Sequence, residues 1–416
     1  MEHVEVLIVG AGPVGTLTAL ALAEQGIEVA VVETEAQLND SPRACVYFAT
    51  TLIALAELGV LPDLEAHSLK VRDFGFHAPE FGFHPVLSMG CLSGITYDYQ
   101  LHCGQDVVAR VAMEHAQKLG TRFHFDHRLV SLTQDSAAVS AELQTPGGPR
   151  TIRARWIIGA DGARSTVRQL LGLEFEGHTW PNRFIATNIY CDMAQYGYQP
   201  SNFICDPVYG GVVARIDAGG LWRLTYHENG DLPADTFMER LPGKFAGFMP
   251  KDAPYRIKAA RPYAIHQRCA PRLRVGRVLL AGDAAHATNP CGGLGLTTGI
   301  WTGMILSDLL GAIRRGEESE GILDRYCEER RRIFWQIASP GASENKRMME
   351  ESDREQRLKD LESISRMVTD PQVARLMMAF PFRVIGNPLR EASRWRNADL
   401  TARTITGLDT RASQLT

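Results

Sequence analysis

Three glycine-centred segments of this 416-residue chain hold the residue types and spacings that could bind a ligand. The first, GAGPVG (Gly10–Gly15), follows the apolar run Val4–Val9. Gly10 permits a tight turn, Gly12 lets the backbone approach a pyrophosphate, and Gly15 permits close packing of a helix on a strand. The helix would begin near Pro13 and Val14, where free N–H groups and the helix dipole favour phosphate. This segment predicts a dinucleotide site but does not separate NAD from FAD.

Two carboxylates extend this first site. Glu33 lies 18 residues after Gly15, at the end of a predicted second strand, where it can accept hydrogen bonds from a ribose. The second segment, Gly159–Gly172, has Asp161 and Gly162 at the junction of a strand and a helix. Asp161 could bind a ligand there, and it could equally serve as the cap of that helix.

The third segment, Val278–Ile300, carries a carboxylate and a run of glycines. Asp283 follows a buried strand, at the sheet edge where ligands of such folds bind, and can hold sugar-alcohol hydroxyls. After Pro290, the glycines up to Gly295 bring bare backbone to a flat ring and open a helix. The N-terminus of that helix would favour negative charge on a reduced flavin, although the glycines could also serve the fold alone.

In this order and separation, the three segments resemble the class A flavin monooxygenases of the para-hydroxybenzoate hydroxylase type, over roughly residues 4–335. In addition, Arg43 falls where the family has an FAD-contacting arginine, and Gln105 matches the glutamine that opens the family's long helix. The resemblance implies FAD as cofactor, with the following binding set: Gly10, Gly12, Pro13, Val14, Gly15, Glu33, Arg43, Gln105, Asp161, Asp283, Pro290, Gly293, Gly295, Leu296 and Thr297.

The resemblance also implies a role for each part of this set. Glu33 would bind the adenosine ribose, Asp283 the ribityl chain, and Gly295–Thr297 the isoalloxazine edge, while Asp161 would serve FAD and the passage of the reductant. Two positions depart from the family, which often has Asn at position 297 and Asp at position 302, where this chain has Thr297 and Thr302. A threonine can still offer its backbone N–H and hydroxyl to the flavin, so FAD binding is expected despite these departures.

The activity implied by the resemblance is hydroxylation of a phenolic or other aromatic substrate. NADPH or NADH reduces FAD, O2 adds at the flavin C4a atom, and the resulting hydroperoxide delivers one oxygen. A second GxGxxG is absent from the sequence, as expected if the nicotinamide cofactor binds only transiently. Two other functions stay open: an FAD-dependent reductase or oxidase of the same fold without oxygen insertion, and a flavin-binding protein without catalysis.

The substrate pocket is less well marked than the cofactor site. Its candidates are Tyr47, Arg215, Tyr226 and His227, each of which could also be a packing residue of a sheet. On a strand, Tyr226 and His227 would face opposite ways, and the sequence does not say which face lines the pocket. His286, close to Asp283, is interpreted as a structural support and not as a base.

These residues require an α/β fold with an inserted α+β portion. A Rossmann-like FAD-binding domain is expected from residues 1–179 and 265–335, including some strands of the substrate sheet. Residues 180–264, rich in short strands and turns, predict an antiparallel substrate-binding sheet. Residues 336–416 predict a helical C-terminal region.

The composition of the chain excludes several classes of binding partner. The net charge of -4 gives no basic surplus for nucleic acid, and the eight cysteines form no CxxC pair, as in a reducing compartment. No metal site is expected. The apolar stretch Leu296–Ile313 carries Asp308 and falls short of a membrane span, and the N-terminus lacks a signal peptide, so a cytoplasmic enzyme is expected. The expected partners are a small aromatic substrate, O2 and NAD(P)H, and a homodimer is left open.

Overall fold

The structure is a computed structural model that describes residues 2–41 and 44–406. Its first sheet has a mostly parallel core formed by pieces far apart in the sequence. In spatial order the main path is β17 (Arg274–Val275), β18 (Val278–Leu280), β11 (Gly148–Gly159), β1 (Glu2–Val9), β2 (Val29–Val32) and β8 (Arg122–His124). The strands β9 (Arg128–Gln134) and β10 (Val139–Thr145) extend β11 in antiparallel fashion.

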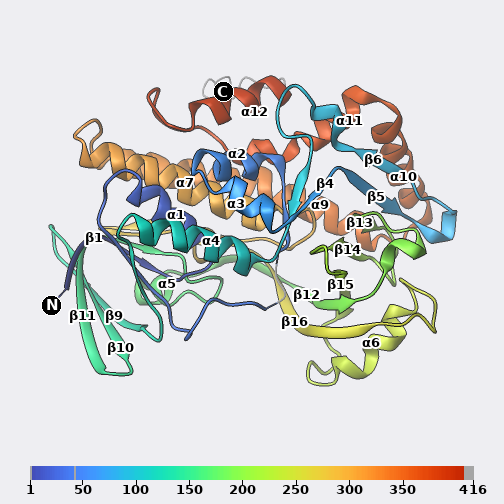
Figure 1. The fold of residues 1–416 in the computed structure, drawn as a ribbon, viewed down its shortest axis with the longest axis horizontal. Helices are drawn as coiled ribbons and strands as arrows, with labels where there is room; N and C mark the ends of the chain where they lie inside the picture. The colour runs from blue at the N-terminus through green and yellow to red at the C-terminus, as the bar shows by residue number, and fades with distance from the viewer. Residues whose placement is uncertain (1, 42–43, 407–416) are drawn as a thin grey trace.

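Three helices form a layer against this sheet: α1 (Pro13–Ala23), α4 (Gln105–Lys118) and α7 (Leu294–Arg314). Figure 1 shows α7, α1 and α4 one below another. The predicted strand, turn, helix and second strand at the N-terminus are confirmed as β1, α1 and β2. The helix α1 is apolar and buried on nearly all sides, because α4 and α7 both pack on it.

The second sheet is antiparallel except for one pair of strands. Its order is β19 (His286–Ala287), β16 (Arg256–Cys269), β12 (Glu176–Tyr190), β15 (Leu221–Asn229), β14 (Gly211–Arg215), β13 (Ser201–Ile204), β5 (Asp73–His77) and β6 (Val86–Ser88). The parallel pair is β13 with β5. One face of the sheet carries the helix α6 (Phe237–Phe245), at the lower right of Figure 1.

The predicted fold class is confirmed, with one addition to the inserted sheet. Residues 73–88 supply two of its strands from the N-terminal part of the chain, which the sequence prediction allowed for without naming them. The proposed boundaries at residues 179/180 and 264/265 fall inside β12 and β16, because both strands continue without a turn. The division into domains stays a prediction.

The other elements complete the core and the C-terminal region. A small sheet holds β3 (Val46–Tyr47), β7 (Gln100–His102) and β4 (Leu69–Val71). The helices not yet named are α2 (Ala49–Glu57), α3 (Leu61–Ala66), α5 (Thr166–Leu170), α8 (Ile322–Ile333), α9 (Ser339–Glu350), α10 (Arg354–Thr369), α11 (Pro371–Met378) and α12 (Arg396–Thr406). The helices after residue 336 bear out the predicted helical region.

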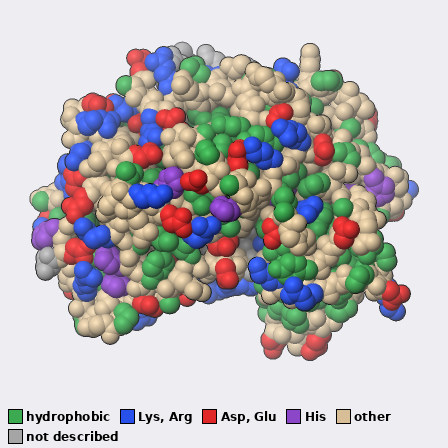
Figure 2. Space-filling view, in the orientation of Figure 1, with side chains coloured by type: hydrophobic (Ala, Val, Ile, Leu, Met, Phe, Trp, Pro, Cys, Tyr) green, Lys and Arg blue, Asp and Glu red, His purple; other side chains and the backbone are tan. Residues whose placement is uncertain are grey.

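The helix α7 is long and apolar enough to cross a membrane by length and composition, but 94% of the window concerned is buried inside the protein. It is therefore described as a core helix. On the face drawn in Figure 2, acidic and basic side chains are intermingled, in keeping with the small net charge of the sequence.

Candidate active site

The three glycine segments emerge from neighbouring strands of the first sheet. The strands β18, β11 and β1 are adjacent and parallel, and they end at Leu280, Gly159 and Val9. Since the carboxyl ends of parallel strands meet at one sheet edge, the three loops meet there as well. A Cβ atom at Gly282 would lie 3.1 Å from the side chain of Val14, so the first and third segments are in contact.

The glycines of the first loop divide their roles by their surroundings. Gly10 has a φ of +109°, and a Cβ atom there would lie 2.5 Å from the carbonyl oxygen of Ala160, in the second segment. A Cβ atom at Gly15 would lie 2.0 Å from the carbonyl oxygen of Gly10. At Gly12, by contrast, no described atom lies within 4 Å of that position. Gly10 and Gly15 serve the turn and the packing, and Gly12 keeps one side of the loop open.

Glu33 is fixed against this loop. Its Oε2 atom accepts a hydrogen bond of 2.8 Å from the Ala11 N–H, and Oε1 accepts one of 3.0 Å from the Glu35 N–H. Each carboxylate oxygen has a second lone pair, so the half-buried group can still accept a bond from a ribose hydroxyl.

Asp161 takes part in the capping of α5, whose N-cap residue is Ser165. Its Oδ1 atom accepts a 2.5 Å hydrogen bond from the Ser165 hydroxyl, and Oδ2 accepts one of 3.1 Å from the Val167 N–H at the start of α5. Burial raises the pKa of the Asp161 carboxyl, while the bonds from Ser165 and the helix N–H groups act in the opposite direction. Of the two interpretations that the sequence left open, the cap is therefore observed, and the role towards FAD stays a prediction.

The third loop presents a carboxylate and a proline to the outside of a buried segment. Asp283 and Pro290 are exposed, whereas Gly282, Ala284 and Cys291 are buried. This exposed carboxylate after β18 can accept hydrogen bonds from the hydroxyl groups of a polyhydroxyl chain.

The start of α7 has bare backbone on one side. Gly293 is its N-cap with a φ of +65°, and a Cβ atom there would lie 2.6 Å from the ring of Phe48. Gly295 and Leu296 in the first turn are half-buried, and the Thr297 hydroxyl donates a 2.9 Å bond back to the Gly293 carbonyl. Thr297 thus uses its hydroxyl within the helix, and it leaves the N–H groups of the first turn as the polar groups for a ligand.

The other departure, Thr302, has a structural partner. Its hydroxyl lies 2.9 Å from Nε2 of His286, and the His286 ring stacks on Phe334 with centroids 5.6 Å apart. Complete burial lowers the pKa of His286 to about 3. His286 is thus a neutral, buried group beneath the loop, in agreement with its interpretation as a support.

Two further members of the predicted FAD set remain. Gln105 is the first residue of α4 and is half-buried, so it opens that helix as expected. Arg43 lies outside the described residues, and its predicted contact with FAD stays a prediction.

The four substrate candidates do not come together. Tyr226 packs in the core beneath α6, 6.2 Å from Phe248 between ring centroids. Arg215 donates hydrogen bonds of 3.0 and 3.1 Å to the carbonyls of Asp217 and Ala218 in a hairpin turn. Tyr47 is buried, and its hydroxyl has no hydrogen-bond partner among the described residues.

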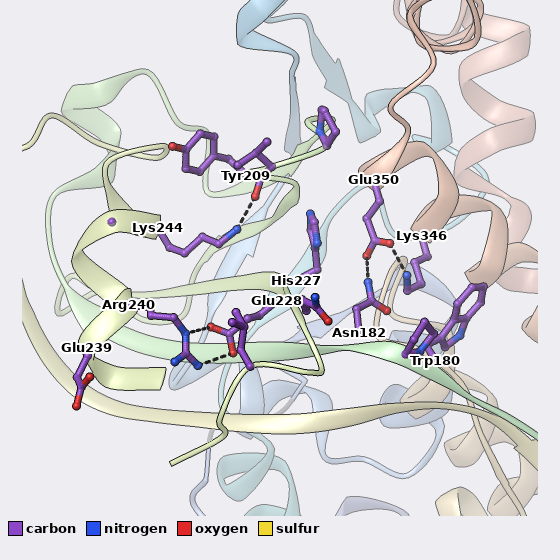
Figure 3. Close-up of a pocket in the computed structure, with 16 residues that line it drawn as sticks. Trp180, Asn182, Tyr209, His227, Glu228, Glu239, Arg240, Lys244, Lys346 and Glu350 are labelled. Atoms are coloured by element: carbon purple, nitrogen blue, oxygen red, sulfur yellow. Dashed lines mark hydrogen bonds and ion pairs between the residues drawn. The ribbon is translucent and has the colours of Figure 1, made fainter. Parts of the chain in front are cut away.

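His227 lines a separate cavity of about 930 Å³ at the end of the second sheet. Figure 3 shows it between Glu228 of the same strand and the pair Lys346 and Glu350 of α9. Burial lowers the pKa of His227, and the nearby carboxylate of Glu350 opposes this shift. None of the described members of the predicted FAD set lines this cavity, so His227 and the glycine loops do not share it.

The face of the second sheet opposite α6 carries polar residues that the sequence prediction did not select. Arg223 of β15 and Asn188 of β12 lie opposite each other, and the Arg223 Nε donates a 2.6 Å bond to Asn188 Oδ1. Tyr263 of β16 lies near Arg223 and near Cys291 of the third loop. The alternation of side chains along LWRLTYH (residues 221–227) could have indicated Arg223, because it places this residue and Tyr226 on opposite faces of the strand. It does not identify which face is covered by α6.

The residues present fit FAD. An open side at Gly12, a carboxylate fixed beside it at Glu33, an exposed carboxylate at Asp283 and the bare start of α7 lie around one sheet edge. They offer, in order, room for a pyrophosphate, an acceptor for a ribose, an acceptor for a polyol and N–H groups for a ring oxygen.

Comparison with known proteins agrees with this assignment. A family model described as an FAD binding domain matches residues 3–340. The chain is 42% identical over 376 residues to para-nitrophenol 4-monooxygenase of Pseudomonas sp. (strain WBC-3), covering 89% of this chain and 93% of the relative. It is 40% identical over 357 residues to 6-hydroxy-3-succinoylpyridine 3-monooxygenase of Pseudomonas putida (strain DSM 28022 / S16), covering 82% and 88%.

Solved structures show the same likeness. The crystal structure of p-nitrophenol 4-monooxygenase from Pseudomonas putida DLL-E4 has a TM-score of 0.90 and 39% identity, covering 93% of this chain and all of that one. Aklavinone-11 hydroxylase, solved with FAD and aklavinone, has a TM-score of 0.76 and 27% identity, covering 84% of this chain and 69% of that one. The chain therefore belongs to the FAD-binding-domain family and is a class A flavoprotein monooxygenase that hydroxylates an aromatic substrate.

Proposed function

We propose that this enzyme uses NAD(P)H to hydroxylate a phenol or hydroxypyridine at the ring carbon para to the hydroxyl, where the substrate already carries a substituent. The observation that carries the proposal is the position of attack given in the names of the two relatives that are 42% and 40% identical to this chain. Para-nitrophenol 4-monooxygenase acts at the carbon that bears the nitro group, and the second relative acts at carbon 3, which bears the succinoyl group and lies para to the 6-hydroxyl.

The described members of the predicted FAD set would hold the cofactor at the sheet edge. Bound FAD supplies electrons from the nicotinamide and the activation of O2. The chain's own residues orient it: the backbone at Gly12 and the start of α7 would bind its phosphates and ring, and Glu33 and Asp283 would bind its hydroxyls. Arg43 completes the proposed set.

A basic cluster beside the second loop supports NAD(P)H as the reductant. Arg164 is exposed, and Arg168 donates hydrogen bonds of 3.0 and 2.7 Å to the carbonyls of Ala284 and Ala163. Burial lowers the pKa of His266, and the positive charges of Arg268, Arg164 and Arg168 lower it further, so these groups lie close together. Arg168 is buried and bound to carbonyls, so the exposed Arg164 is the member of this cluster that we propose for the phosphates of a nicotinamide dinucleotide.

The experiment begins with the purified protein and 4-nitrophenol. The expected result is a yellow flavoprotein whose NAD(P)H oxidation rises on adding the phenol, with one nitrite formed for each NAD(P)H consumed. Oxygen enters at the substituted carbon, nitrite leaves with the electron pair of its bond to carbon, and the ring is released as a quinone. The two electrons of NAD(P)H reduce the second oxygen atom to water.

The control substrate is 3-nitrophenol, in which the nitro group is not para to the hydroxyl. It should give no nitrite, whether or not it stimulates NAD(P)H oxidation. Equal nitrite from both isomers, or NAD(P)H oxidation without oxygen from 18O2 in the product, contradicts the proposal. The latter result would favour a reductase or oxidase, which the named relatives do not favour.

A cytoplasmic location is proposed on the state of the cysteines. All eight are free thiols, as expected in a reducing compartment.

A further inference from the structure

Arg223 lies in the middle of β15 on the face of the second sheet that turns away from α6. Its neighbours Trp222 and Leu224 belong to the apolar cluster beneath α6. Because side chains alternate along a strand, the Arg223 side chain projects from the other face. Phe184 and Tyr263, which pack with Cys291 of the third loop, mark this other face as the side of the cofactor loops.

The guanidinium is buried and held in place. Arg223 is 6% exposed and Asn188 is 7% exposed, and their 2.6 Å hydrogen bond joins two adjacent strands. A buried arginine is costly unless hydrogen bonds and opposite charge compensate it. This position therefore keeps a fixed, oriented donor group within the protein.

Two hydroxyl groups and one thiol group lie near this charge. Burial raises the pKa of Tyr263, Tyr47 and Cys45, and in each case the positive charge of Arg223 opposes the rise. Arg223 is thus close enough to all three to act on their ionisation. A group that favours the anionic form of these buried side chains would act in the same way on a phenol bound among them.

The segment Cys45–Phe48 connects this charge to the proposed flavin position. At one end Cys45 packs with Ala214 of β14, the residue opposite Arg223, and at the other end the Phe48 ring lies against Gly293. Tyr263 makes the same link from the sheet side, since it lies near both Arg223 and Cys291. A substrate ring between the second sheet and the start of α7 would therefore lie within reach of Arg223.

We propose that Arg223 binds the ring oxygen of the aromatic substrate as an oxyanion, and that Asn188 is the positioning residue that orients its guanidinium. The phenol O–H bond breaks with its electron pair kept on oxygen, and the proton passes to solvent. The anion makes the para carbon more electron-rich, which is what attack by an electrophilic oxygen requires. The inference rests on the proposed phenolic substrate and names the group that selects its ionised form.

The test uses 4-nitrophenol as an optical probe, because its anion absorbs visible light and its neutral form does not. The probe is titrated into the FAD-loaded enzyme without NAD(P)H at a series of pH values. The wild-type enzyme should bind it as the anion even below its solution pKa. Arg223→Gln should weaken binding about 10- to 100-fold, the range for a charge-assisted hydrogen bond, and abolish the pKa shift of the bound probe.

Matched measurements separate recognition from folding. The methyl ether 4-nitroanisole cannot ionise, so Arg223→Gln should bind it as the wild type does. Arg223→Lys should keep part of the pKa shift, and Asn188→Ala should weaken anion binding without abolishing the shift. Arg215→Gln, which removes an arginine of the adjacent strand bonded to turn carbonyls, should leave anion binding as in the wild type. FAD content and melting temperature establish that each variant is folded.

The inference is overturned if the wild type binds the probe as the neutral phenol or not at all. It is equally overturned if Arg223→Gln loses anisole and anion together, or if Arg215→Gln loses as much as Arg223→Gln. Anion binding through Arg223 without nitrite formation supports the inference and contradicts the proposed reaction. Nitrite formation by the wild type, together with unchanged anion binding in Arg223→Gln, supports the proposed reaction and contradicts the inference.

Discussion

At the scale of single residues, Gly12 and Gly15 differ in what a methyl group would meet. At Gly12 a Cβ atom finds no described atom within 4 Å, and the φ of -69° suits alanine. We expect Gly12→Ala to keep the melting temperature of the FAD-free protein and to weaken FAD binding about tenfold or more, because the methyl group occupies the pyrophosphate space. Fluorescence titration of the stripped protein with FAD measures this.

Gly15→Ala is the contrasting variant. Its methyl group would lie 2.0 Å from the Gly10 carbonyl oxygen, so α1 must move away from the loop. This variant should lower the melting temperature even without FAD. If Gly12→Ala destabilised the FAD-free protein as much as Gly15→Ala, the open side of the loop would not be a ligand position.

The basic cluster yields a second prediction at this scale. Arg164 is exposed at the second loop, so its replacement should not disturb the fold. We expect Arg164→Gln to raise the KM for NAD(P)H about tenfold, since one charge-assisted bond to phosphate is lost, with FAD affinity unchanged. Steady-state kinetics at fixed phenol concentration, with Arg325→Gln as an exposed control on α8, check it. An unchanged KM would exclude this loop from nicotinamide binding.

At the scale of elements, the sequence predicts the loops at the ends of strands better than it predicts which face of a strand is buried. Glycines and carboxylates at strand ends have few conformational alternatives, so the loops of Gly10, Asp161 and Asp283 were placed correctly around one edge. The alternation of side chains along β15 assigns residues to two opposite faces of the strand. Only the packing of α6 shows which of these faces is covered. Hence Tyr226 was a candidate and Arg223 was not.

Long-range pairing also escapes local patterns. The parallel contact of β13 with β5 joins residues more than a hundred positions apart, and neither strand carries a signal for the other. Similarly, the capping bonds of Asp161 become visible only when α5 is in place, because a strand-to-helix aspartate fits a cap and a ligand equally well.

Arg330 is one of several buried side chains that attach the C-terminal region to the cofactor domain. Arg330 of α8 is 0% exposed, and its guanidinium donates bonds of 2.8 and 2.9 Å to the carbonyls of Ile385 and Val384. Burial lowers its pKa to about 10. Both carbonyls lose their donor if this side chain is replaced.

We therefore expect Arg330→Met to lower the free energy of unfolding by about 2–4 kcal/mol, because two buried carbonyls are left unsatisfied. Chemical denaturation measures the change, and proteolysis should cut first after residue 370. The exposed Arg325 on the same helix is the matched control, and Arg325→Met should change stability by less than about 0.5 kcal/mol. Equal effects of the two substitutions would contradict the anchoring role.

At the scale of the whole molecule, the burial of neutral histidines ties stability to pH. Nδ1 of His102 donates a 2.7 Å bond to the Arg215 carbonyl, and burial lowers the His102 pKa to about 4. His286 is buried in the same neutral state, with a pKa of about 3. These folded-state pKa values lie below the ordinary value of about 6.5. At pH values between the folded-state pKa and about 6.5, the unfolded chain therefore binds more protons than the folded chain. Their stabilisation is complete above about pH 6.5 and is lost as the pH falls towards 4 and 3.

From pH 7 to pH 5, each of these histidines should reduce the free energy of unfolding by about 2 kcal/mol. Urea denaturation at the two pH values measures the total, which also contains carboxylate contributions, so a variant must isolate one group. His102→Asn keeps a donor for the Arg215 carbonyl but cannot titrate, and it should show a pH-dependent loss about 2 kcal/mol smaller than the wild type. Replacing the exposed His67 by Asn should leave the loss unchanged. If His102→Asn and the wild type lose the same free energy, His102 is not buried as a neutral group, and the acid sensitivity arises elsewhere in the molecule.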